Sequence, residues 1–96
     1  MTIERGLASN TVSAYTRDLA RYESWCSDRG ISAIDAVTQN DVADFGASLR
    51  RETPERAALS ASSAARAVVS VRSFHRFVAR EGMTTTDPAR DVSPPT

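Results

Sequence analysis

The sequence has few of the residues on which most enzyme and metal sites depend. Its 96 residues contain one cysteine and one histidine, and every basic residue is arginine. A single cysteine cannot form an internal disulfide, and one cysteine with one histidine falls short of the ligands that a metal site needs. The four glycines are scattered and form no phosphate-binding loop. We therefore expect no metal and no other cofactor.

Long apolar runs are also missing. No stretch of about 18 apolar residues is present, which excludes a membrane-spanning helix. The first residues lack the apolar centre of a signal peptide, and a lone cysteine fits a reducing compartment, so we expect a cytoplasmic protein. The hydrophobic content of 41% is enough for one globular domain with a modest core.

Charge is balanced overall but unevenly distributed. The net charge is zero; residues 60–82 contain four arginines and one glutamate, a local charge of +3, whereas residues 31–59 have a local charge of −2. Recognition of nucleic acid depends on where positive charge gathers more than on its total. The balanced charge therefore does not exclude DNA binding, and the last third of the chain is the candidate for a DNA-binding segment.

Hydrophobic residues recur at helical spacing in three segments, and no segment alternates as a strand would. The segments expected to be helical are residues 10–29, 39–51 and 60–81, with a short turn near 88–91. The capping residues expected at their starts are Ser9 or Asn10, then Thr38 with Asp41 as a capping box, then Ser60. Gly30 and Gly82 are placed to end the first and third helices.

Each predicted helix has one apolar stripe, and these stripes must face one another to be buried. The stripe residues are Val12, Tyr15, Leu19, Tyr22 and Cys26; Val42, Phe45 and Leu49; and Ala64, Val68, Val71, Phe74 and Val78. This pattern predicts an all-α fold, a small bundle of three long helices with short helical turns. Cys26 continues its stripe, so we interpret it as a packing residue and not as a nucleophile paired with His75.

Hydroxyl and arginine side chains line the polar faces of two helices. On the third helix these are Ser62, Ser63, Arg66, Ser70 and Ser73, with Arg76 and Arg80 flanking them. On the first they are Asn10, Thr11, Ser13 and Arg17. Short hydroxyls let a helix approach DNA closely, and arginine binds phosphate or guanine. Ordinary solvated faces can have the same composition, so the pattern favours DNA without establishing it.

Three stretches resemble the N-terminal domain of Xer-type tyrosine recombinases and integrases, with the XerD branch the closer match. They are TIERGLASNTVSAYTRDL at residues 2–19, SSAAR followed by VRSFHRF within residues 62–77, and DPARDVSPP at residues 87–95. The resemblance implies a core-binding, SAM-like domain over residues 1–92 and the start of an interdomain linker at 93–96. It also implies that the family's first helix is truncated here, with Ile3 to Leu7 as its end.

The resemblance further implies a function. In this family the domain forms half of a clamp around duplex DNA, and the matching helices place Asn10–Arg17 and Ser62–Arg76 against it. The family's catalytic residues lie in a C-terminal domain, beyond Thr96, so we expect no catalysis from this chain. The implied partners are duplex DNA, that catalytic domain and other recombinase subunits, in DNA integration or chromosome dimer resolution. The alternative is a helical protein-interaction module without DNA binding.

Overall fold

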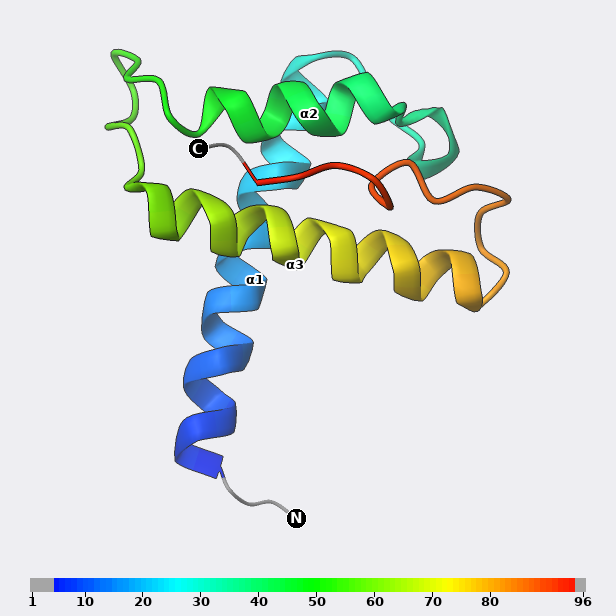
Figure 1. The fold of residues 1–96 in the computed structure, drawn as a ribbon, viewed down its shortest axis with the longest axis horizontal. Coiled ribbons are helices and arrows are strands. Elements are labelled where there is room, and N and C mark those ends of the chain that lie inside the picture. The colour runs from blue at the N-terminus through cyan, green and yellow to red at the C-terminus, as the bar shows by residue number, and fades with distance from the viewer. Residues whose placement is uncertain (1–4, 95–96) are drawn as a thin grey trace.

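The computed structural model describes the backbone of residues 5–94 and the side chains of residues 12–94. It contains three helices, α1 (Arg5–Asp28), α2 (Gln39–Ser48) and α3 (Ala61–Arg80), with one turn of 3₁₀-helix, η1 (Ile34–Ala36). No strand occurs within residues 5–94, so the predicted all-α fold is confirmed. Figure 1 shows α2 and α3 running antiparallel, with α1 crossing behind them. Within the described part of the chain, no helix is long and apolar enough to cross a membrane.

Helix α1 begins earlier than the predicted start at residue 10. It runs without interruption from Arg5, so Ser9 and Asn10 lie inside the helix and do not cap it. The residues before them include the good helix formers Leu7 and Ala8 and no proline, so nothing ends the helix there. Leu7 therefore belongs to α1 and not to a separate preceding helix, while Ile3 lies outside the described residues. At the other end Gly30, with φ of +83°, terminates the helix as predicted.

The signals at the start of the other two helices are confirmed. Thr38 accepts a hydrogen bond from the Asp41 amide and the Asp41 carboxylate accepts one from the Thr38 amide, which completes the capping box. Ser60 accepts a hydrogen bond from the Ser63 amide at the start of α3. Helix α2 ends at Ser48, short of the predicted residue 51, because the amides of Arg50 and Arg51 turn to tighter, three-residue hydrogen bonds.

The core lies where the three helices meet, and most of the predicted stripe residues are in it. All three stripe residues of α2 are buried, as are Tyr22 and Cys26 of α1. Val12 was predicted to be in the core, but its side chain is 60% exposed, because this part of α1 extends beyond α3 (Figure 1). The turn at residues 88–91, which is confirmed, adds two further core residues, Ala89 and Val92.

A buried carboxylate joins α1 to α3. Asp18, only 2% exposed, accepts hydrogen bonds from Arg66 Nε at 3.1 Å, from Arg66 Nη2 at 2.9 Å and from Ser70 Oγ at 2.9 Å. A buried ionised carboxylate is tolerated only when such donors replace the water that it has lost. This cluster therefore fixes where α1 crosses α3.

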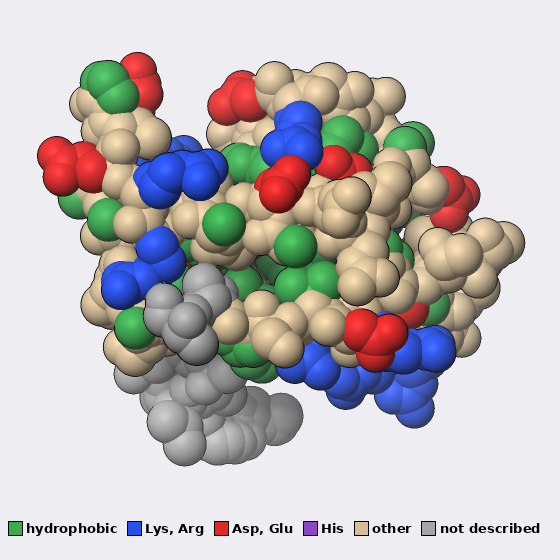
Figure 2. Space-filling view, turned by 45° about the horizontal axis from the view of Figure 1, so that its top comes forward, with side chains coloured by type: hydrophobic (Ala, Val, Ile, Leu, Met, Phe, Trp, Pro, Cys, Tyr) green, Lys and Arg blue, Asp and Glu red, His purple; other side chains and the backbone are tan. Residues whose placement is uncertain are grey.

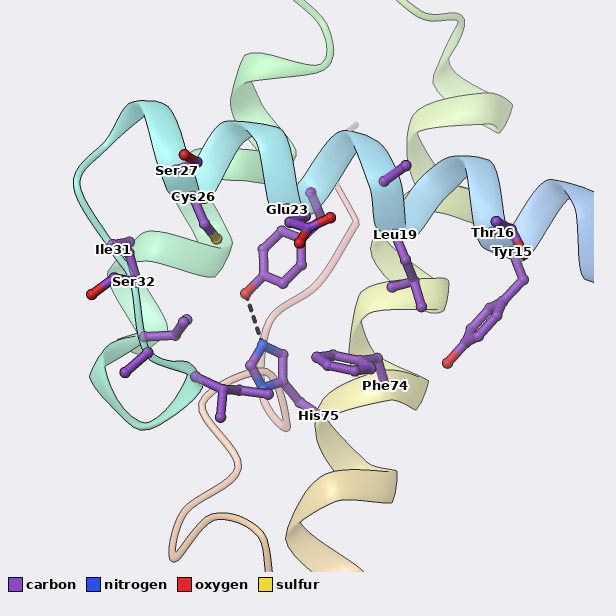
Figure 3. A pocket seen from close by; sticks show the side chains of 15 residues that line it. Tyr15, Thr16, Leu19, Glu23, Cys26, Ser27, Ile31, Ser32, Phe74 and His75 are labelled. Carbon is purple, nitrogen blue, oxygen red and sulfur yellow. Dashed lines mark hydrogen bonds between the residues drawn. The ribbon is translucent and has the colours of Figure 1, made fainter.

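A second polar contact between the same two helices lies in the core. The hydroxyl of Tyr22 and Nε2 of His75 are 2.7 Å apart (Figure 3). His75 is fully buried, and its Nδ1 atom has no hydrogen-bond partner within the described residues. Burial lowers the pKa of His75 below its ordinary value of 6.5, and the neighbouring charge of Asp87 opposes that shift. The packed core therefore favours the neutral imidazole.

The Asp18 cluster generates a prediction about stability. Replacing Asp18 by asparagine removes the charge and places an amide beside the donors of Arg66 and Ser70. We expect the free energy of unfolding to fall by about 2–3 kcal/mol, since one partner of a largely buried pair is lost while Arg66 keeps some access to water. Urea denaturation followed by circular dichroism measures the change. Asp44→Asn, which breaks an exposed pair with Arg29, is the control and should cost less than about 1 kcal/mol.

His75 generates a prediction about pH. The unfolded chain takes up a proton near the ordinary pKa of 6.5, whereas the buried imidazole resists protonation. The stabilisation is therefore complete above that pH and decreases as the pH falls toward the lower, folded pKa. We expect the free energy of unfolding to decrease by up to about 1.4 kcal/mol per pH unit between roughly pH 6.5 and 5. The slope should be flatter in His75→Gln; an unchanged slope would show that another group causes it.

Candidate nucleic-acid interface

Most of the predicted polar face of α3 is exposed to solvent. Ser62, Ser73 and Arg76 are exposed, and Ser63 is half-buried. They recur at helical spacing on the side of α3 opposite its buried residues. The hydroxyls of Ser60 and Ser62 are 3.3 Å apart at the amino end of the helix, where free amides and the helix dipole favour an anion. This face therefore offers hydroxyl and guanidinium donors to a ligand.

Ser70 is a correction to the predicted face. Its side chain is only 8% exposed, and its hydroxyl donates to Asp18. Ser70 lies one helical turn after Arg66, on the edge of α3 that α1 covers at the crossing. The hydroxyl is therefore used inside the protein and is not available to DNA.

Arg66 binds Asp18 and is also partly exposed. Two of its N–H groups bind Asp18, which raises the pKa of the guanidinium, yet the side chain remains 46% exposed. A guanidinium has five N–H donors, so the outer edge can still bind another acceptor. Because the contact with Asp18 restrains the side chain, little further conformational entropy is lost when that acceptor binds.

The predicted face of α1 is described in part. Ser13 and Arg17 are exposed. The backbone of Asn10 and Thr11 lies within α1, while their side chains lie outside the described residues. On the helix, Arg17 and Arg21 lie one turn apart and Ser13 one turn before them, so the three share one side of α1. This side of α1 therefore carries two arginines.

Sequence reasoning missed three features of this region. Val69, which is 49% exposed, lies between Arg66 and Ser73 on the face of α3, where an apolar group could contact a thymine methyl. Asp18 was not identified as a buried residue, although it is a charged residue at a stripe position, between Tyr15 and Tyr22. Arg21 was not identified as part of a site, because nothing in the local pattern connects it to other segments.

Arginines are not confined to one place on the surface. Figure 2 shows a group of basic side chains at the lower right, on the side where α3 ends in Figure 1, and others at the left, with acidic residues between them. The described residues include no cluster of histidine, cysteine and carboxylates that could hold a metal ion.

A groove of different character lies on another side of α1. It has a volume of about 740 Å³ and is lined largely by apolar and aromatic residues from α1, η1 and α3, among them Tyr15, Leu19, Ile31, Ile34 and Phe74 (Figure 3). Cys26 also lines it, and burial raises the pKa of its thiol, in keeping with the predicted packing role. The groove has little charge and does not suit a nucleic acid.

Comparison with known proteins supports the resemblance. The family described as "Phage integrase, N-terminal SAM-like domain" matches residues 1–82. The chain is 52% identical over its whole length to tyrosine recombinase XerD of Mycobacterium tuberculosis, and it covers 32% of that protein. It is 51% identical to XerD of Mycobacterium leprae over its whole length, covering 31%. For XerD of Corynebacterium glutamicum the identity is 43% over 99% of this chain, with 31% of the relative covered.

These matches lie in the N-terminal part of the relatives, and the chain spans about a third of their length. No solved structure matches the chain. The profile match covers most of the chain, and the all-α architecture is the one expected of a SAM-like domain. The protein thus belongs to the family of phage integrase N-terminal SAM-like domains.

Proposed function

We propose that this domain binds duplex DNA as the N-terminal half of a clamp in a site-specific tyrosine recombinase. The observation that carries the proposal is the exposed serine and arginine face of α3, which includes Ser62, Arg66 and Arg76, in a domain whose relatives are named tyrosine recombinases. Arg17 on α1 is also exposed and is included in the proposed contact. Both helices were proposed as the DNA-binding elements from the sequence alone.

The geometry suits the major groove. A groove about 12 Å wide accepts one α-helix, and α3 is 20 residues long, or about 30 Å. Serine hydroxyls along such a helix can bind phosphate oxygens without holding the helix away from the bases. Arg76 and the outer edge of Arg66 can bind phosphates or guanine. Ser70, which binds Asp18, is not part of this proposal.

The whole recombinase would supply the remaining steps. We propose that catalysis resides in a C-terminal domain of the whole recombinase. That catalytic domain and other recombinase subunits would be the protein partners of the present domain, in DNA integration or chromosome dimer resolution. Residues 1–92 would then act as the core-binding unit. Tethering two DNA-binding domains in one chain raises the effective concentration of each at the same duplex, so weak binding by this domain alone is sufficient.

A protein-interaction module is the second candidate, and the apolar groove between α1, η1 and α3 favours it. Such a groove suits the apolar face of a helix from another protein. The two candidates use different surfaces, because the groove lies along Leu19 and Phe74 whereas the proposed DNA face contains Ser62 and Arg66. Mapping the surface that responds to DNA therefore separates them.

We predict weak, salt-sensitive binding of duplex DNA by the 96-residue chain, with a dissociation constant of about 10⁻⁴ to 10⁻⁶ M. Amide chemical shifts measured during titration with a short duplex should change along residues 60–76 and around Ser13 and Arg17. Arg76→Gln should weaken binding while leaving the circular dichroism spectrum unchanged. Changes that cluster on α2, or along the apolar groove, would show that the proposed face is wrong.

A further inference from the structure

A polar cleft lies between α1 and the loop that joins α2 to α3. Its volume is about 430 Å³, and its walls come from α1, the end of α2 and residues 51–57. Arg21 reaches it from α1 and Arg56 from the loop, with Trp25 between α1 and α2. The cleft therefore brings together two arginines that are far apart in the sequence.

The loop that presents Arg56 is held in shape by its own hydrogen bonds. At its base the Leu59 amide donates to the Leu49 carbonyl at 2.8 Å, and Arg50 Nη1 donates to the Leu59 carbonyl at 2.7 Å. At its tip the Arg56 amide binds the Thr53 hydroxyl at 3.0 Å, and the Thr53 amide binds the Arg56 carbonyl at 2.8 Å. The backbone at Arg56 is therefore held in a defined turn, and its side chain is exposed.

The positive charge near the cleft exceeds the negative charge that balances it. Asp18 lies one turn before Arg21 on the same side of α1, and its carboxylate is already bound by Arg66 and Ser70. Burial lowers the pKa of the Arg21 guanidinium, and the neighbouring charges of Arg56 and Arg66 lower it further, while Asp18 raises it. Arg21 thus has two guanidinium groups and one carboxylate among its charged neighbours.

Two acidic residues also line the cleft. Asp28 is seven residues after Arg21 on α1, about 10 Å along the helix axis, and Glu55 is in the loop beside Arg56. Arg51 lines the cleft as well, so the arginines of the cleft outnumber its carboxylates. Asp18, one turn before Arg21, binds Arg66 of the proposed DNA face, so the Arg21 side of the cleft lies near that face.

We propose that Arg56, together with Arg21 and Arg66, binds a phosphate of the DNA backbone, so that the footprint extends from the helices onto the α2–α3 loop. This inference rests on the proposed DNA-binding function. Guanidinium groups bind phosphate through paired N–H donors, and that of Arg66 is already restrained by Asp18, so it loses little entropy on binding. A phosphate contact carries no sequence information, so this loop fixes the position of the domain along the duplex and not the base sequence that is read.

The test is the salt dependence of binding by the 96-residue chain and its variants, measured by the fluorescence anisotropy of a labelled duplex. Loss of one phosphate contact reduces the slope of log affinity against log salt by about 1. We therefore expect Arg56→Gln to weaken binding roughly tenfold at about 50 mM salt and only about threefold at about 200 mM. Arg56→Lys keeps the charge and should recover most of the slope.

The matched control is Arg29→Gln, which changes the net charge equally. Arg29 is already paired with Asp41 and Asp44, and it lies eight residues after Arg21 in the sequence, so its loss should leave the slope unchanged. If the wild-type chain binds duplex and Arg56→Gln has the wild-type affinity and slope, the loop contact is refuted while the proposed function stands. If the wild-type chain does not bind duplex, the proposed function fails, and this inference fails with it.

Discussion

The relative position of α1 and α3 depends on one buried carboxylate. Asp18 lies on α1, and all three of its hydrogen bonds come from α3. Apolar packing alone would allow α1 to slide or rotate against α3 at modest cost, because dispersion contacts have no strong direction. A buried charge removes that freedom, since any displacement leaves a carboxylate without donors. The angle between the two polar faces is therefore set by hydrogen-bond geometry.

Under the proposed function, this arrangement would link stability to recognition through Arg66. The inner edge of its guanidinium completes the Asp18 cluster, while the outer edge belongs to the exposed face. A lysine at this position would keep the charge but could not bind Asp18 with two parallel N–H groups. The residue that we expect at the DNA is thus also one that holds the helices together, so its removal alters both properties at once.

Local signals in the sequence were sufficient for the fold class and for most helix boundaries. The capping box at Thr38 and Asp41, the cap at Ser60 and the glycine at position 30 each act within a few residues, so the pattern alone identifies them. The buried stripes of α2 and α3 were predictable for the same reason. The start of α1 was not, because Ser9 and Asn10 are good caps only where the preceding residues leave the helix.

The candidate face was only partly predictable, because the helical periodicity of the sequence does not show which edge of a helix is covered by another helix. Ser62 and Ser70 share the polar side of α3, yet α1 crosses beside Ser70 and leaves Ser62 exposed. The cleft formed by Arg21 and Arg56 joins segments 35 residues apart in the sequence, and no local pattern relates them. Asp18 was the one sequence signal for the contact between α1 and α3, since a charge at a stripe position requires a partner on the facing helix.

Trp25 gives this protein a built-in optical probe. It is the only tryptophan in the sequence, its ring lies 5.7 Å from that of Phe45, and the guanidinium carbon of Arg29 lies 4.7 Å from the ring centre. It also lines the cleft that contains Arg21 and Arg56. Indole emission responds to local polarity and to neighbouring charge, so the intrinsic fluorescence of the unlabelled chain reports both on the docking of α1 against α2 and on any anion that enters the cleft.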